Sequence, residues 1–416
     1  MAQNTADPSA TAAPPPIVVA AYSRPGALRR LLESLNAAYY PVPGVRLIIS
    51  IDGGGPTGVK DVARSFSFHH GELKIVEWKK NLGLRQHILW CGDQAIDHGS
   101  AIVLEDDLIV DPYFYQFACR CLDAYSDEEK VAGIALYSPR YNEFAELPFE
   151  PLFNGTSNFF AQVPCSWGQA WSASQWAAFR NWYGKGEQTL VNDSSSLPDV
   201  VRRWPESSWK KYFSAYLLAQ GRYFVYPYRS YTTNCSDPGG IHVASGTNRF
   251  QVPLGHPERV QETFTFQPMK EHLFKYDAYM EPEPDLFERW LDLENGSLGV
   301  DLYGIKSATL MHGLPLTLTS RPVRGAHATF PLVYRPIEAN VQLREPISSS
   351  PFFSLADSER VLFDKAPVRE RLIDYFSYSA ILSLRFLVPG MCLALWDRLK
   401  RFTKKLRQFN ASRGSR

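Results

Sequence analysis

The sequence lacks an excess of charge of either sign. Its 416 residues include 44 lysines and arginines against 43 aspartates and glutamates, which gives a formal net charge of +1. Proteins that bind nucleic acid concentrate positive charge to meet the phosphate backbone, and this chain as a whole does not. Residues 398–416 carry eight basic side chains and no acidic one, but no nucleic-acid-binding module accompanies them. We therefore expect no nucleic-acid partner.

Metal-binding and redox patterns of cysteine are also missing. No Cys-x-x-Cys pair occurs, and no spacing matches a structural zinc site. P-loops, nucleophile elbows and internal repeats are absent as well. We interpret all six cysteines as reduced thiols of the core in a reducing compartment; they are Cys91, Cys119, Cys121, Cys165, Cys235 and Cys392.

Long uninterrupted apolar segments are lacking at both ends. Residues 1–15 are rich in alanine, proline, threonine and serine without an apolar centre, so we expect a disordered leader and not a signal peptide. The apolar stretch 375–396 contains Arg385 and Pro389, which argues against a transmembrane helix. Because a basic run follows, we predict that residues 372–416 bind an anionic membrane surface, which makes the protein cytoplasmic and peripherally membrane-associated. A packed helix with a solvated tail is the alternative.

The first third of the chain contains a regular alternation of apolar runs and amphipathic segments. Short apolar runs joined through helical patterns by brief connections predict an α/β fold, a mostly parallel central sheet with flanking helices. The predicted strands are 17–21, 45–51, 73–77 and 101–104, and the predicted helices are 26–36, 59–66 and 84–97. Ligands of such sheets bind beyond the carboxyl ends of the strands.

The most informative stretch follows the last of these strands. Glu105, Asp106 and Asp107 stand directly after the apolar run 101–104. Isolated buried carboxylates are costly, so the strand must end there and the acids must face water or cations. Three oxygen donors at the carboxyl end of a strand suit a divalent metal that carries phosphates. The alternative is a solvated acidic turn.

Polar residues also follow the earlier strands. Arg24 comes after the first strand, and Asp52 stands after the second and before three glycines that permit a ligand to approach. Asp52 is suited to accept hydrogen bonds from a ribose or a base, although Asp-Gly is also common in turns. The loop Asn81–Arg85 and His87 are expected on the same side, with a structural role as the alternative for this histidine.

In order along the chain, the segments AYSRP, SIDGG, NLGLRQH and VLEDD resemble the nucleotide-binding half of GT-A glycosyltransferases. The sequence looks closest to the N-acetylglucosaminyltransferase I-like group and to bacterial polysaccharide-cluster glycosyltransferases, over roughly residues 16–245. The resemblance implies a GT-A catalytic domain with a nucleotide half, 16–130, and an acceptor half, 131–260, followed by a C-terminal extension, 261–371. It also implies transfer of a sugar from a UDP-sugar to an acceptor hydroxyl, with inversion and with Mn²⁺ or Mg²⁺ as cofactor.

The same resemblance implies roles for individual residues. The metal would be held by Asp107, Glu105 and His242. On the donor side, Glu105 and Asp106 would contact sugar and ribose, and the nucleotide would be bound by Arg24, Asp52, Asn81, Arg85 and His87. The acceptor would meet Trp167, Gly168, Trp171 and Trp209, although large aromatic side chains are more often part of a core.

The chain departs from the family pattern where the catalytic base is expected. Relatives carry aspartate directly after the tryptophan that corresponds to Trp209, and this chain has Lys210. A lysine would need strong desolvation to act as a base near pH 7. We therefore assign the base to Glu206 or Asp237, with Asp199 as a further carboxylate. A lost activity is the alternative.

Other functions stay open from the sequence. A nucleotidyltransferase uses a similar fold and similar acids, a catalytically degenerate protein would bind the sugar nucleotide without turnover, and a membrane scaffold would do neither. The predicted acceptor is a glycan or a lipid-linked molecule in glycan or polysaccharide synthesis, whose sugar and linkage the sequence does not name.

Overall fold

The computed structural model describes residues 13–186, 196–237, 248–258, 263–342 and 351–365, together with Cys392, Leu395 and Trp396. The chain divides into two compact units, Met1–Ala366 and Pro367–Arg416. Among the described residues, no helix has the length and apolarity needed to cross a bilayer. The predicted membrane-binding segment, 372–416, lies almost entirely outside the described residues.

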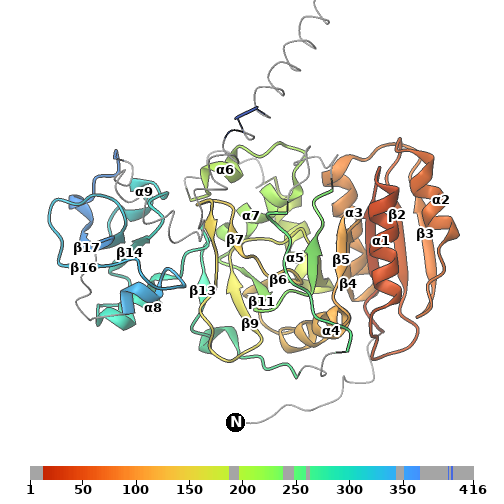
Figure 1. Cartoon of the computed structure of the whole chain (residues 1–416), viewed down its shortest axis with the longest axis horizontal. Coiled ribbons are helices and arrows are strands. Elements are labelled where there is room, and N and C mark those ends of the chain that lie inside the picture. The colour runs from red at the N-terminus through yellow and green to blue at the C-terminus, as the bar shows by residue number, and fades with distance from the viewer. Residues whose placement is uncertain are drawn as a thin grey trace, which may run out of the picture. The chain divides into compact units, whose positions relative to one another are not determined.

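The first half of the large unit alternates strand and helix as the sequence predicts (Figure 1). The strands are β1 (Ile17–Ala21), β2 (Leu47–Ile51), β3 (Leu73–Glu77) and β4 (Ser100–Glu105), and the helices between them are α1 (Pro25–Asn36), α2 (Thr57–Ser65) and α3 (Gly83–His98). All three neighbouring strand pairs run parallel, with Ile17 aligned to Leu47 on one side and to Ile102 on the other. Their carboxyl ends therefore meet at one edge.

The second half extends the same sheet to nine strands, in the order β13-β9-β11-β6-β10-β4-β1-β2-β3. The added strands are β6 (Val131–Ala135), β9 (Asn158–Ala161), β10 (Gln169–Ser172), β11 (Tyr223–Pro227) and β13 (Lys275–Tyr276). Most neighbouring pairs are parallel, but β10 enters antiparallel between β4 and β6, and β9 runs antiparallel to β11. The predicted α/β fold with a mostly parallel sheet is confirmed.

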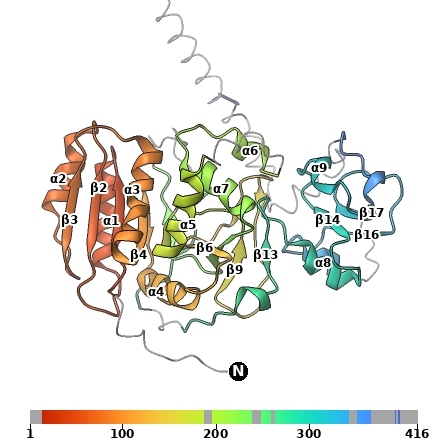
Figure 2. The same ribbon diagram turned by 180° about the vertical axis from the view of Figure 1, so that it is seen from behind.

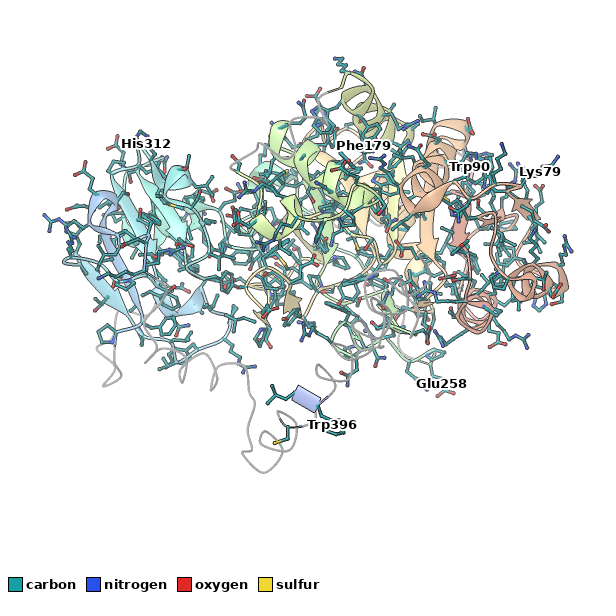
Figure 3. The ribbon with its side chains drawn as sticks, turned by 90° about the horizontal axis from the view of Figure 1, so that it is seen from above. Lys79, Trp90, Phe179, Glu258, His312 and Trp396 are labelled. Atoms are coloured by element: carbon teal, nitrogen blue, oxygen red, sulfur yellow. The ribbon has the colours of Figure 1, made fainter. Side chains whose placement is uncertain are left out.

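Two hydrophobic cores lie on opposite faces of the sheet. The adjacent residues Ile17 and Val18 of β1 face different cores: Val18 packs with α3, α5 (Ala173–Gly184) and α7 (Trp209–Ala219), whereas Ile17 packs with α1, α2 and α4 (Phe114–Ala124). Figure 2 shows these layers from behind, and in Figure 3 Trp90 of α3 and Phe179 of α5 lie on neighbouring helices. Burial on both faces explains why the central strands are continuous apolar runs.

Short elements complete the large unit. Helix α6 (Asp199–Arg202) precedes α7, β5 (Leu108–Val110) pairs with β12 (Thr232–Asn234), and β7 (Tyr141–Asn142) pairs with β8 (Leu147–Pro148). A smaller lobe follows β13, with the sheet order β14 (Leu298–Asp301), β15 (Leu316–Thr319), β17 (Phe353–Asp357) and β16 (Ala328–Phe330). Its helices are α8 (Pro284–Leu291), α9 (Ala308–Met311) and α10 (Ala339–Gln342).

Buried ion pairs connect the smaller lobe to the segment after β13. The Lys306 ammonium lies 2.5 Å from Asp277 Oδ2 and 2.7 Å from Glu281 Oε2. Within the lobe, Arg321 Nε lies 2.8 Å from Asp301 Oδ2. Because removing one partner of a buried pair leaves an uncompensated charge, loss of Lys306 or of Glu281 should destabilise this part of the chain.

The six cysteines are all free thiols, but they do not all lie in the core. Cys91, Cys121 and Cys165 are buried as expected. Cys392 is exposed, so the prediction of six core thiols is wrong for this residue. The two remaining cysteines, 119 and 235, are half-buried.

Candidate functional site

A cavity of about 470 Å³ lies at the carboxyl ends of β1, β2 and β4, where an α/β sheet places its ligands. Its lining includes most of the residues that the sequence singles out. These are Arg24, Asp52, Asn81, His87, Glu105, Asp106, Asp107, Trp167, Trp209 and Asp237. The fold therefore brings together side chains from both halves of the predicted catalytic region.

Glu105 ends β4, Asp106 and Asp107 form the turn to β5, and Arg24 binds both aspartates. Arg24 Nη2 donates to Asp106 Oδ1 at 2.5 Å, and its Nη1 donates to Asp107 Oδ2 at 2.9 Å. The backbone N–H of Cys235, just beyond β12, donates to the carbonyl oxygen of Asp107 at 2.9 Å. These contacts anchor the turn at the edge of the sheet, with its carboxylates on the cavity.

The triad holds more negative charge than its cationic partners neutralise. Burial and the neighbouring carboxylates of Asp107 and Asp106 raise the pKa of Glu105 to about 8. Burial also raises the pKa of Asp106 to about 6, although Arg24 opposes that shift. A further cation at this turn would be electrostatically favoured.

The free carboxylate oxygen at this turn suits a metal ion that binds together with a phosphate ligand. Oδ1 of Asp107 is buried and has no hydrogen-bond partner among the described residues, while Oδ2 binds Arg24. Mg²⁺-type sites typically take one or two carboxylates and fill their other positions with water and substrate phosphates. Within the described ranges, no group of three or more His, Cys, Asp or Glu side chains is placed to hold a metal by itself. The predicted ligand His242 lies outside the described residues.

Asp52 accepts hydrogen bonds from the backbone, mainly at the loop that leads into α3. Its Oδ1 accepts hydrogen bonds from the N–H groups of Gly53 at 2.8 Å and Leu82 at 2.7 Å, and its Oδ2 accepts one from Gly83 at 3.1 Å. A Cβ atom on Gly53 would lie 2.3 Å from the carbonyl carbon of Lys80, so glycine is needed here for the two loops to approach. Asp52 thus shapes the cavity wall that carries Asn81.

His87 is a buried residue of the first turns of α3 that also lines the cavity. Its Nε2 lies 2.8 Å from Ser50 Oγ, which accepts a hydrogen bond from Trp78 Nε1 at 3.1 Å. Burial lowers the pKa of His87, although the charge of Asp52 opposes the shift. The imidazole is therefore neutral near pH 7 and presents a polar edge without a charge.

The second half of the chain contributes aromatic rings and one ion pair to the lining, besides Asp237 and several smaller polar side chains. The ring centroids of Trp167 and Phe250 are 4.7 Å apart, and Lys210 Nζ lies 5.1 Å from the ring centroid of Trp204 and 5.8 Å from that of Trp167. The same ammonium donates to Glu143 Oε1 at 2.7 Å. Sequence reasoning missed Glu143, Trp204 and Phe250, because they lie in irregular segments without a local pattern.

Two residues of the predicted acceptor segment do not line the cavity. Trp171 is 0% exposed and packs in the core against Trp176, with ring centroids 4.5 Å apart, so the prediction that it contacts an acceptor is wrong. Gly168 has a φ of 93°, and a Cβ atom there would lie 2.7 Å from the side chain of Thr232. It is a packing glycine and not a contact for substrate.

Arg85 and Glu206 also lie outside the residues that line the cavity. The guanidinium of Arg85 stacks 5.0 Å from the ring centroid of Tyr212. The side chain of Glu206 is 65% exposed and binds the Tyr212 hydroxyl and the Lys211 ammonium, and both contacts lower its pKa. Of the two carboxylates that we assign as the base, only Asp237 reaches the cavity, where it pairs with Arg30 of α1.

Comparisons with known proteins give a limited result. No protein-family model matches the sequence, and no curated protein matches it either. Among solved structures, the chain is similar to S. aureus TarS (residues 1–349), at 12% identity and a TM-score of 0.35, over 52% of this chain and 59% of that one. The complex of that protein with UDP-GlcNAc gives a TM-score of 0.36 at 12% identity, over 56% and 61% of the two chains.

A second similar structure is the mannosyltransferase PcManGT from Pyrobaculum calidifontis in complex with GDP-Man and Mn²⁺, at 12% identity and a TM-score of 0.28, over 39% of this chain and 47% of that one. The chain thus spans less than two thirds of each of these proteins. The functional assignment rests on the cavity itself.

Proposed function

We propose that this protein is a metal-dependent glycosyltransferase that moves a sugar from a UDP-sugar to an acceptor hydroxyl in glycan or polysaccharide synthesis, with inversion. The observation that carries the proposal is the acidic turn at the cavity, with Asp106 and Asp107 bound to Arg24 and one buried oxygen of Asp107 unpaired among the described residues. A diphosphate with its counter-ion is the ligand that such a charge distribution favours.

The donor would lie along the wall built by the first half of the chain. In this proposal neutral His87 faces the uracil, and Asp52 holds the loop so that Asn81 reaches the nucleotide. Glu105 and Asp106 contact sugar and ribose hydroxyls. A Mn²⁺ or Mg²⁺ ion on Asp107 would neutralise the charge that develops on the leaving diphosphate.

The acceptor would lie against the rings of Trp167, Trp204 and Phe250. Aromatic faces pack well against the apolar faces of sugar rings, which supports a glycan or a lipid-linked sugar as the acceptor. Binding of residues 372–416 to an anionic membrane surface would bring the enzyme to a lipid-linked acceptor.

A panel of nucleotide sugars with Mn²⁺, scored by release of free nucleotide, tests the proposal. We expect slow UDP release from a UDP-sugar and a loss of the Mn²⁺-dependent part of UDP affinity in Asp107→Asn, measured by calorimetry. Asp61→Asn, an exposed site on α2, is the control. Binding without release of nucleotide would indicate a degenerate protein, and release of pyrophosphate from a nucleoside triphosphate would indicate a nucleotidyltransferase.

A further inference from the structure

The carboxylates that line the cavity differ in their hydrogen-bond and ion-pair partners. Asp52 binds three backbone N–H groups, and Asp106 and Asp107 bind Arg24. Asp237 pairs with Arg30 of α1, which places it on the side of the first half of the chain. Glu105, the last residue of β4, lies beside the two aspartates of the turn. These five carboxylates therefore belong to the first half of the chain or pair with it.

Glu143 is the lining carboxylate that lies among the aromatic rings. It belongs to the irregular segment between β7 and β8, and its side chain is 29% exposed. Lys210 Nζ, 2.7 Å from its Oε1, also lies within 6 Å of the ring centroids of Trp167 and Trp204. Oε2 of Glu143 is therefore the oxygen with capacity to accept a proton from a molecule in the cavity.

Lys210 is suited to hold this carboxylate in place. Its side chain is 15% exposed, and from the first turn of α7 its ammonium donates to Glu143 Oε1. Charge-assisted hydrogen bonds of this kind are short and directional. The pair joins residues 67 positions apart, so it fixes the loop of Glu143 onto the start of α7.

We propose that Glu143 is the general base that takes the proton of the acceptor hydroxyl, with Lys210 as its positioning residue; this assignment rests on the proposed function. The acceptor oxygen forms a bond to the anomeric carbon, and the bond from that carbon to the diphosphate oxygen breaks with its electron pair on UDP. The hydroxyl proton moves to Oε2 of Glu143 and later to water. Positioned bases of this kind contribute about 10²–10⁴-fold to rate.

Azide distinguishes the role of the base from the other roles of the site, because azide attacks as an anion and needs no general base, whereas water does. With the best UDP-sugar of the panel, we expect Glu143→Gln to reduce water-dependent UDP release by about 100-fold or more. Formation of the glycosyl azide, detected by mass spectrometry, and the affinity for UDP should stay within about twofold of the unmodified protein. Glu146→Gln, an exposed residue of the same loop, should change neither rate.

Lys210→Gln tests the positioning role. Lys210 Nζ holds Oε1 of Glu143 at 2.7 Å, so this variant should lose at least about tenfold of the water-dependent UDP release, while glycosyl azide formation and UDP affinity stay within about twofold. Lys210→Arg, which keeps a cationic donor, should restore most of the release. Equal losses with water and azide in either Glu143→Gln or Lys210→Gln, or unchanged water-dependent release in Glu143→Gln, would each overturn the assignment. If the unmodified protein releases no nucleotide from any donor, the proposed function itself is wrong, and the assignment falls with it.

Discussion

Replacing Asp52 with asparagine should loosen the loop before α3 and weaken nucleotide binding. The buried carboxylate accepts three backbone hydrogen bonds, from Gly53 at 2.8 Å, Leu82 at 2.7 Å and Gly83 at 3.1 Å. Asparagine keeps the acceptor oxygen for the first two. Its amino group would face the N–H of Gly83, so at least one charge-assisted hydrogen bond is lost.

The size of the effect follows from these contacts. A hydrogen bond to a charged group contributes about 1.5–3 kcal/mol, and a negative charge near the first turn of α3 adds about 0.3–1 kcal/mol. We therefore expect the free energy of opening the loop to fall by about 2–4 kcal/mol. That loss corresponds to amide exchange at Leu82 and Gly83 that is on the order of 30- to 700-fold faster. Because the proposed UDP site includes this loop, the free energy of UDP binding should weaken by about 1–3 kcal/mol.

Hydrogen exchange followed by mass spectrometry measures the loop, and calorimetry measures UDP affinity. Asp61→Asn removes the same charge from an exposed position of α2 and serves as the control. Exchange at Leu82 and Gly83 that matches the unmodified protein, together with a change in UDP affinity below about 0.3 kcal/mol, would refute the reasoning and reduce Asp52 to a turn residue.

Three further predictions concern the rest of the chain. Trp171→Ala should lower the free energy of unfolding by about 3–5 kcal/mol in urea titrations, because the side chain is fully buried. Burial raises the pKa of Glu338 in the folded protein to about 7, from 4.5. As the pH rises from about 4.5 to about 7, the unfolded chain loses this proton while the folded protein keeps it, so the free energy of unfolding falls by on the order of 3 kcal/mol. Glu338→Gln should flatten that fall in unfolding titrations from about pH 5 to about pH 8. Deletion of 372–416 should abolish sedimentation with anionic vesicles and leave UDP affinity unchanged, because the residues that line the cavity lie between Ala20 and Phe250.

The nucleotide half of the fold could be predicted because its signals are local. An apolar run between helical segments is readable as a strand, and the buried β1 and the edge strand β3 both have the predicted bounds, 17–21 and 73–77. The triad could be placed at the strand end by the cost of burying carboxylates, and β4 runs one residue further than predicted, to Glu105, before Asp106 and Asp107 turn. Because these strands are parallel, the order of segments along the chain was enough to predict that Arg24 and Asp52 lie at the same sheet edge as the triad.

The remaining errors come from contacts that no local pattern encodes. Trp167 and Trp171 flank Gly168 and together resemble a platform for a sugar ring, but β10 enters antiparallel between β4 and β6 and places the Trp171 ring in the core. Asp52 looks free to bind a ribose, yet the loop at Leu82 folds back onto it. The smaller lobe falls within the predicted C-terminal extension, 261–371, but the sequence predicts no bounds for its strands. The helices α9 and α10 between them have four residues each, so the alternation of strand and helix that marks the first third of the chain cannot be read here.

The two walls of the cavity are therefore built differently, and this difference has a consequence for specificity. The proposed donor wall consists of strand ends and loops that consecutive βα units hold in place, with Asp52 hydrogen-bonded to residues about 30 positions away. The proposed acceptor wall depends on the contact between Glu143 and Lys210 and on rings such as Phe250, which lies in an irregular segment. Because loops tolerate sequence change better than sheet strands do, the acceptor can change through these segments while the donor site keeps its geometry. A chimera in which residues 137–151, the segment with β7, Glu143 and β8, are replaced by the corresponding loop of another glycosyltransferase should therefore change acceptor preference and leave UDP affinity unchanged. A simultaneous loss of UDP affinity would contradict the division into two walls.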